Sequence, residues 1–189
     1  SRAIVASGVQ SAIWPAPTSE FYQPWFDFYP LYLAETDGTM LVEDGKSTFD
    51  SDAGSEVAEF WKTFYDEKLS PNEASTDDAM SAGTTAMQLA GPWAIPSYAD
   101  TVDVGFMPVP TSDGRENPTT FADSKSVSMF TACENQGTAW EFLKFSTSVE
   151  SDGQLLEATG QMPMRIDLTG TYADYFDANP NYVAFAEQA

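Results

Sequence analysis

Histidine is absent from this 189-residue chain, and cysteine occurs once, as Cys133. Without histidine, the chain cannot build a Ser-His-Asp or Cys-His catalytic centre or a histidine-ligated zinc or iron site. A single cysteine cannot form an intrachain disulfide, so the cysteine count leaves the redox compartment open. No stretch approaches 18 consecutive apolar residues, so we expect no transmembrane helix. The chain begins at Ser1 without a charged and apolar leader, and we therefore expect a processed or truncated chain.

Basic residues are scarce: eight Lys and Arg stand against 29 Asp and Glu, which gives a net charge of −21. Such a surface repels a phosphate backbone, which argues against nucleic-acid binding. The content of 13 Phe, 8 Tyr and 5 Trp argues against disorder. Because the carboxylates are dispersed, we predict a globular protein from a high-salt habitat, where screening over roughly 3 Å at 1 M removes the self-repulsion.

The most informative stretch of the sequence runs from Gly83 to Trp93. Residues 85–90 predict a short strand, which Gly91 and Pro92 terminate. Trp93 then follows on a turn, where its ring can face a cleft and stack on a ligand with an apolar face and a hydroxyl rim, such as a sugar. The alternative is that Trp93 is a core residue, as most tryptophans near strand ends are.

The clearest predicted helix opens at Asp50–Asp52 and ends before Pro71. Its apolar face comprises Val57, Phe60, Trp61, Phe64 and Tyr65. The Asp-x-Asp spacing at its start also resembles a calcium loop, but the glycine and closing glutamate of such a loop are misplaced. We therefore interpret the aspartates as a helix cap and expect no metal site.

Turn and periodicity signals predict the remaining elements. They indicate a hairpin between the Asp-Gly pairs 37–38 and 44–45, strands at 102–109 and 126–131, and helices at 77–82, 135–145, 151–159, 172–176 and 182–186. Residues 21–33 are crowded with aromatic rings, and no element is assigned to them. Trp61 and Trp140 lie on predicted apolar helix faces, so we expect both in the core.

Four stretches, in this order, resemble the extracellular solute-binding proteins of ABC importers, in the sugar-binding family that includes maltose-binding protein. The stretches are Gly83–Trp93 with its G-x-x-A-M…G-P-W pattern, Val104–Pro110, the A-W-x-F-L-K-F helix Ala139–Phe145, and the G-x-x-P-x-R crossing Gly160–Arg165. The resemblance implies an α/β, periplasmic-binding-protein-like (type II) fold of two lobes and no catalytic activity, cofactor or metal.

Family members are roughly twice as long, so the resemblance implies that a signal peptide, an anchor cysteine and most of the first lobe are missing. Residues 1–118 and 161–189 would build the second lobe, and residues 119–160 would return to the first lobe. Membrane association would then occur only through a missing N-terminal anchor.

The resemblance also implies aromatic ligand contacts. It makes Trp93 a stacking platform for a sugar and Trp25 a second aromatic contact. Asp27 becomes a candidate acceptor for sugar hydroxyl groups.

The resemblance places three further candidates around the same cleft. Asp123 and Ser124 follow the polar loop, in a stretch that presents backbone and small side chains to ligand, although family members often carry glycine there. Arg165 either reaches the cleft from the crossing or pairs with a local carboxylate.

We therefore predict the substrate-binding component of an ABC importer, extracellular and either tethered to the cell surface or periplasmic. It would bind a neutral sugar between its lobes and deliver it to the membrane permease subunits. One alternative is a glycoside hydrolase, which needs two carboxylates flanking the bond, but no motif singles out such a pair. Another is a secreted carbohydrate-binding module, which would be all-β and is disfavoured by the predicted helices.

Overall fold

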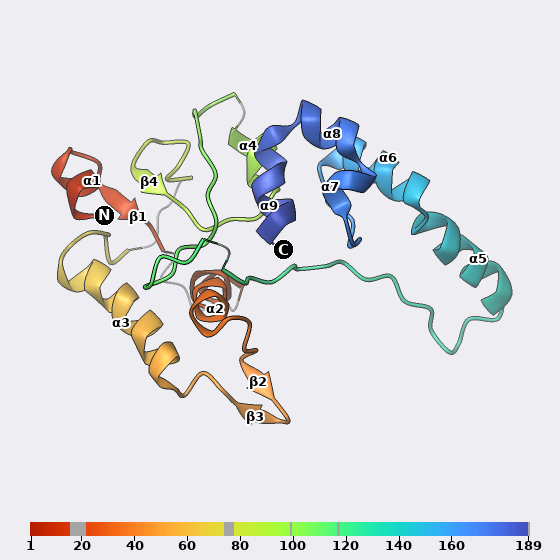
Figure 1. The fold of residues 1–189 in the computed structure, drawn as a ribbon, viewed down its shortest axis with the longest axis horizontal. Coiled ribbons are helices and arrows are strands. Elements are labelled where there is room, and N and C mark those ends of the chain that lie inside the picture. Colours follow the sequence, from red (N-terminus) through yellow and green to blue (C-terminus); the bar gives the residue numbers. More distant parts are fainter. Residues whose placement is uncertain (16–21, 74–77, 99, 117, 189) are drawn as a thin grey trace.

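The computed structural model describes residues 1–15, 22–73, 78–98, 100–116 and 118–188 (Figure 1). The first part comprises α1 (Arg2–Ala6), β1 (Ser11–Ile13), α2 (Tyr22–Thr36), β2 (Val42–Glu43), β3 (Lys46–Ser47), α3 (Asp52–Asp66), β4 (Thr85–Met87) and α4 (Ala94–Tyr98). After a long irregular stretch follow α5 (Gln136–Ser146), α6 (Val149–Thr159), α7 (Leu168–Thr171), α8 (Ala173–Ala178), the 3₁₀ helix η1 (Pro180–Tyr182) and α9 (Val183–Gln188). The chain is thus a mixed α/β structure.

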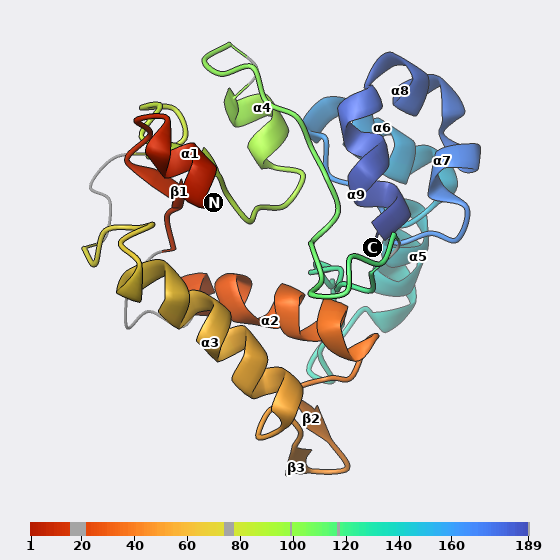
Figure 2. The same cartoon turned by 60° about the vertical axis from the view of Figure 1, so that its left-hand side comes forward.

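A short parallel pair of strands joins β1 and β4, with Ser11 opposite Thr85 and Ile13 opposite Met87. The predicted strand at 85–90 is confirmed for its first three residues. The connection between the two strands contains α2 and α3, which pack along one another (Figure 2). Parallel strands require such a crossover, because a short turn can join only antiparallel neighbours.

Helix α3 confirms the prediction of a capped amphipathic helix. The Ser51 hydroxyl accepts a hydrogen bond from the Gly54 N–H at 3.3 Å, which satisfies one of the free amides of the first turn. Val57 and Phe64 are buried, whereas Phe60 is 38% exposed at the edge of the face. The helix ends at Asp66, five residues before Pro71.

The ring-rich segment forms α2, a helix that we did not predict because it contains Pro24 and Pro30. Proline is tolerated in the first helical turn, where the N–H groups have no intrahelical acceptor, so Pro24 costs the helix no backbone hydrogen bond. Pro30 removes one backbone hydrogen bond from the middle of the helix. Burial of Leu31 and Tyr32 offsets this loss, since both join a core cluster with Val57 of α3.

The predicted turn at Asp44-Gly45 is confirmed. It joins β2 to β3, with Val42 opposite Ser47. Asp44 has φ 50° and Gly45 has φ 72°, the pair of positive values that a tight type I′ hairpin turn requires.

The C-terminal helices have a core of their own, formed by Leu156 of α6, Phe176 of α8 and Tyr182 of η1. The predicted helix at 151–159 is confirmed as α6, and Gly160 ends it at φ 70°, in the left-handed cap position that glycine favours. The Tyr175 ring lies against Tyr182, with 5.6 Å between centroids. Burial, and to a smaller extent the hydrogen bond with Tyr182, raises the pKa of Tyr175 to about 12. The predicted helical pieces at 172–176 and 182–186 correspond to α8 and α9. Both predictions are confirmed, within one or two residues at each end.

Three predicted elements were wrong. Residues 102–109 and 126–131 are not strands, because no neighbouring strand in the described part of the chain forms a ladder with them. Residues 78–82 form hydrogen-bonded turns rather than a helix, with Ala82 N–H donating to Asp78 O at 2.9 Å. The start of that predicted helix, at residue 77, lies outside the described residues.

The prediction that Trp140 is a core residue was also wrong. Helix α5 forms as expected, but Trp140 is 54% exposed and no residue of the helix is buried. Trp61, by contrast, is half-buried, as its position between two core clusters requires.

Candidate functional site

Aromatic side chains from three separate segments meet beside α2. This group, which we call the aromatic cluster, comprises Trp25, Phe26 and Tyr29 of α2, Trp93 of the turn before α4, and Phe121 of the long irregular stretch. The Trp25 and Phe121 centroids are 4.5 Å apart, and those of Phe26 and Trp93 are 5.5 Å apart. The fold thus brings Trp25 and Trp93, both predicted ligand contacts, to the same cluster.

Trp93 combines an exposed ring with a fixed position. Its side chain is 50% exposed, while its partner Phe26 is only 7% exposed and meets it edge to face. A Cβ at Gly91 would overlap the six-membered ring of Trp93, so only glycine lets the indole lie back over the chain at this point. An exposed ring held on one side in this way can serve as a stacking surface.

Asp27 lies at the boundary between α2 and α3. Its backbone carbonyl accepts a hydrogen bond from Trp61 Nε1 at 2.9 Å. The pKa of Tyr65 on α3 is raised by burial and then by the negative charge of Asp27. Two residues along a helix turn the side chain by about 200°, so Asp27 and Trp25 lie on opposite sides of α2.

Asp123 and Ser124 lie two and three residues after Phe121, which belongs to the aromatic cluster. Both are exposed. The Asp123 carboxylate forms an ion pair with Lys125 at 2.6 Å, and the Ser124 N–H donates to the Ala122 carbonyl at 3.1 Å. A hydroxyl group that approaches Asp123 meets a carboxylate already oriented by its neighbour.

Arg165 lies on the irregular segment between α6 and α7, where its side chain packs against α6. Its Nη2 is 2.6 Å from Asp152 Oδ2 and also donates to the Thr147 carbonyl at 2.6 Å. Burial would lower the pKa of Arg165, but the hydrogen bond and charge of Asp152 raise it above its usual value. Of the two roles considered from the sequence, the structure thus shows the pairing with a local carboxylate.

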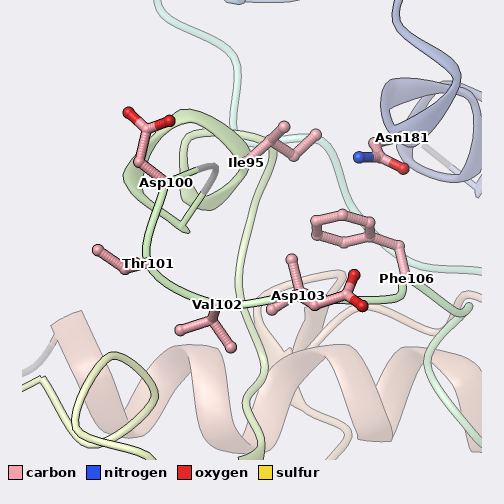
Figure 3. A pocket seen from close by; sticks show the side chains of 8 residues that line it. Ile95, Asp100, Thr101, Val102, Asp103, Phe106 and Asn181 are labelled. Carbon is pink, nitrogen blue, oxygen red and sulfur yellow. The ribbon is translucent and has the colours of Figure 1, made fainter.

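A surface hollow of about 450 Å³ lies between α4 and η1 (Figure 3). Ile95, Phe106 and Asn181 line it together with residues 100–104. The carboxylates of Asp100 and Asp103 lie at opposite ends of the hollow and do not converge. Among the described residues, no group of three or more His, Cys, Asp or Glu side chains could hold a metal ion.

Sequence reasoning missed Phe26 and Tyr29 as parts of the site. Their signal was the spacing of Trp25 and Tyr29, four residues apart, which places both rings on one helix face. That signal is readable only once α2 is recognised as a helix. Phe121 was also missed, because nothing local to it indicates contact with residues nearly a hundred positions earlier.

The parallel β1–β4 pair and its helical crossover form the α/β part of this chain, and α2 of that crossover carries three rings of the aromatic cluster. The family model for bacterial extracellular solute-binding proteins matches residues 5–181, and the chain belongs to this family. The family is not catalytic. No curated protein matches the sequence. In the described part of the chain, none of the helices is both long and apolar enough to cross a membrane.

Solved structures confirm the α/β fold. An uncharacterised protein of Listeria monocytogenes EGD-e, lmo0859, is 30% identical with a TM-score of 0.79, and the match covers 99% of this chain and 51% of that one. The sugar-binding protein MalE of Xanthomonas citri is 16% identical with a TM-score of 0.71, over 95% and 46% of the two chains. Maltose-bound MalE3 of T. maritima is 20% identical with a TM-score of 0.59, over 100% and 51%.

This chain therefore spans about half the length of the solved relatives that it matches. That proportion is consistent with part of a two-lobe fold. The matches give no support to an origin in a high-salt habitat, which stays a prediction from the net charge alone.

Proposed function

We propose that this chain is part of the substrate-binding component of an ABC importer and that it holds a neutral sugar against the aromatic cluster. The observation that carries the proposal is the half-exposed Trp93 ring, fixed by Phe26 and by the absence of a Cβ at Gly91. Two structural neighbours support the ligand class, since one is a sugar-binding protein and the other was solved with maltose.

The chemistry of the cluster suits a sugar. The C–H face of a pyranose ring stacks on the Trp93 indole, and its hydroxyl rim can donate to the Asp123 carboxylate or bond the Ser124 hydroxyl. A phosphorylated ligand is disfavoured by the net charge of −21. We therefore assign Trp25, Trp93, Asp123 and Ser124 to the ligand. The positions of Asp27, at the α2–α3 boundary, and of Arg165, paired with Asp152 of α6, suit structural roles.

In this proposal the chain binds its ligand outside the cell and passes it unchanged to membrane permease subunits. An anchor outside this sequence would tether it to the cell surface, or a periplasm would retain it. The glycoside hydrolase alternative requires two carboxylates that flank a bond. Asp123, two residues after Phe121 of the aromatic cluster, is paired with Lys125.

The experiment uses the indole N–H signals of the five tryptophans as reporters in NMR spectra of the 15N-labelled chain. Maltose, glucose and glucose 6-phosphate are titrated to millimolar concentrations, and each signal is assigned from its Trp→Phe variant. A neutral sugar should shift the Trp93 and Trp25 signals, while the Trp61 and Trp140 signals serve as internal controls. Shifts confined to Trp61 or Trp140, or a stronger response to the phosphate ester, would contradict the proposal.

Catalysis is tested in the same samples. The sugar signals of maltose should stay unchanged over days, because a binding component passes its ligand on unchanged. Release of glucose that disappears in an Asp123→Asn variant would favour the hydrolase instead.

A further inference from the structure

The turn that carries Trp93 lies between two packed regions of the molecule. Leu89 precedes Trp93 and packs against the core cluster that α2 and α3 share, whereas Ile95 follows it and packs against the core of the C-terminal helices. In Figure 1 and in Figure 2, α4 accordingly lies between the β1–β4 pair and α9. The position of the Trp93 ring therefore depends on how this turn is held between its two neighbours.

Helix α4 cannot hold the turn by itself. It comprises only Ala94–Tyr98, and Pro96 within it lacks an N–H group. A helix of so few residues makes too few backbone hydrogen bonds to be stable in isolation. Tertiary contacts therefore set its place, and the side chain at its end, Tyr98, is only 7% exposed.

Tyr98 links the end of α4 to segments on both sides of β4. Its hydroxyl group lies 2.8 Å from Gln88 Oε1, directly after β4, and 3.2 Å from Asp78 Oδ1, which precedes β4. The single hydroxyl proton is shared between these two acceptors. Burial, and then the negative charge of Asp78, raises the pKa of Tyr98, so the hydroxyl group stays a donor.

Asp78 is itself held in place. Its carboxylate accepts hydrogen bonds from the N–H groups of Met80 and Ser81 at 3.1 and 3.3 Å. The N–H group of Thr85, the first residue of β4, donates to the Ala79 carbonyl at 3.2 Å. The hydroxyl group at the end of α4 thus bonds to a turn that is fixed to the strand.

These contacts enclose the turn that presents Trp93. The hydrogen bond between Tyr98 and Gln88 closes a loop over residues 88–98, and Trp93 lies at its middle. The Trp93 ring meets Phe26 edge to face and is 50% exposed. Because half of the ring has no protein around it, its orientation depends on the backbone of this loop.

We propose that Tyr98 is a positioning residue for the ligand site. Its hydroxyl group links α4 to the segments around β4 and thereby holds the Trp93 ring in the orientation that stacks on a sugar. Tyr98 acts through Trp93, because its own side chain is buried. The effect on sugar binding rests on the proposed function, whereas the effect on the ring rests on the geometry of the loop alone.

The first test compares two buried tyrosines in the ligand-free, 15N-labelled chain. Tyr98→Phe removes the hydroxyl group and keeps the ring. Tyr32→Phe is the matched control, because Tyr32 is 1% exposed and donates to the Thr48 carbonyl at 2.9 Å. Both variants should lower the Tm by about 2–4 °C. The heteronuclear NOE of the Trp93 indole should fall in Tyr98→Phe alone, with the hydrogen-bonded Trp61 indole as the fixed internal reference.

Sugar binding measures the consequence. Tyr98→Phe should raise the Kd for maltose about three- to tenfold, and Tyr32→Phe should leave it unchanged. An unchanged Trp93 NOE in Tyr98→Phe, or an equal fall in both variants, would overturn the positioning role. If the unaltered chain binds neither maltose nor glucose while the NOE falls as expected, the proposed function fails and the positioning of the ring stands.

A double-mutant cycle tests Gln88 as the partner of Tyr98. Gln88→Met removes one acceptor at an exposed position, so it should leave the Tm nearly unchanged. It should raise the Kd for maltose less than Tyr98→Phe does, because Asp78 remains as an acceptor. The double variant should bind maltose as Tyr98→Phe alone does. Losses of affinity that multiply in the double variant would show that the two side chains act separately and would overturn the hydrogen bond as the link.

Discussion

Helices α2 and α5 are both rich in aromatic residues, but their rings have different surroundings. In α2, Phe26 and Tyr32 are 7% and 1% exposed, because α3 and the segments around Trp93 and Phe121 cover them. In α5, Phe142 and Phe145 are more than 60% exposed. An apolar helix face therefore indicates only that the helix needs a packing partner. Its side chains are buried in this structure only where that partner is part of the same chain.

The largest expected effect compares a buried phenylalanine of α3, which packs against α2, with an exposed phenylalanine of α5. Phe64 of α3 is 2% exposed within a core cluster, and Phe145 of α5 is 67% exposed. Phe64→Ala should cost about 3–5 kcal/mol of folding free energy, because it leaves a cavity. Phe145→Ala should cost less than about 0.5 kcal/mol, as exposed substitutions usually do.

Thermal melts of both variants measure this difference. For a chain of this size, the Phe64→Ala loss corresponds to a Tm lower by about 6–20 °C. A similar fall in Tm for both variants would show that α5 is packed within this chain. It would contradict the difference between the two helices.

A tryptophan pair gives the next largest effect. Trp61 packs against two core clusters and donates a hydrogen bond to the Asp27 carbonyl at 2.9 Å, whereas Trp140 is 54% exposed. Trp61→Ala should cost about 2–4 kcal/mol, and Trp140→Ala should change little. Denaturant unfolding monitored by circular dichroism provides the measurement, and a larger loss for Trp140→Ala would restore our original expectation that this ring belongs to the core.

The smallest expected effect concerns salt. Because the dispersed carboxylates repel one another, the Tm should rise by several degrees as NaCl increases from about 0.1 to 2 M. The same series with sucrose in place of NaCl is the control for general solute effects. A Tm that is indifferent to NaCl would remove the only support for a high-salt habitat.

Local patterns predicted much of the fold. The Ser51 cap with its apolar face, the Asp44-Gly45 turn and the Gly160 cap are each set by neighbouring residues, and each lies where the sequence indicates. Helix α2 was missed because Pro24 and Pro30 disfavour a helix locally, and only the tertiary burial of Leu31 and Tyr32 outweighs that preference.

Part of the candidate site was predictable because it too depends on neighbouring residues in the sequence. Trp93 follows a strand and a Gly-Pro stop, which favours an exposed ring, and Trp25 and Trp93 do lie at one cluster. The partners Phe26, Tyr29 and Phe121 come together only through long-range packing. The strands predicted at 102–109 and 126–131 need neighbours to form, and a sequence pattern does not reveal whether those neighbours exist in the same chain.

The central claim is that the exposed ring of Trp93 serves a ligand, unlike the exposed rings of α5. Sugar titration calorimetry and thermal melts on Trp93→Ala, with Trp140→Ala as the matched control, test it most directly. The Trp93→Ala variant should keep its Tm within a few degrees and lose about 1–3 kcal/mol of sugar binding, roughly a ten- to hundredfold rise in Kd. Trp140→Ala should bind as the unaltered chain does. A Trp93→Ala variant that melts early and binds sugar with unchanged Kd would contradict the account, because Trp93 would then be a core residue rather than a binding surface.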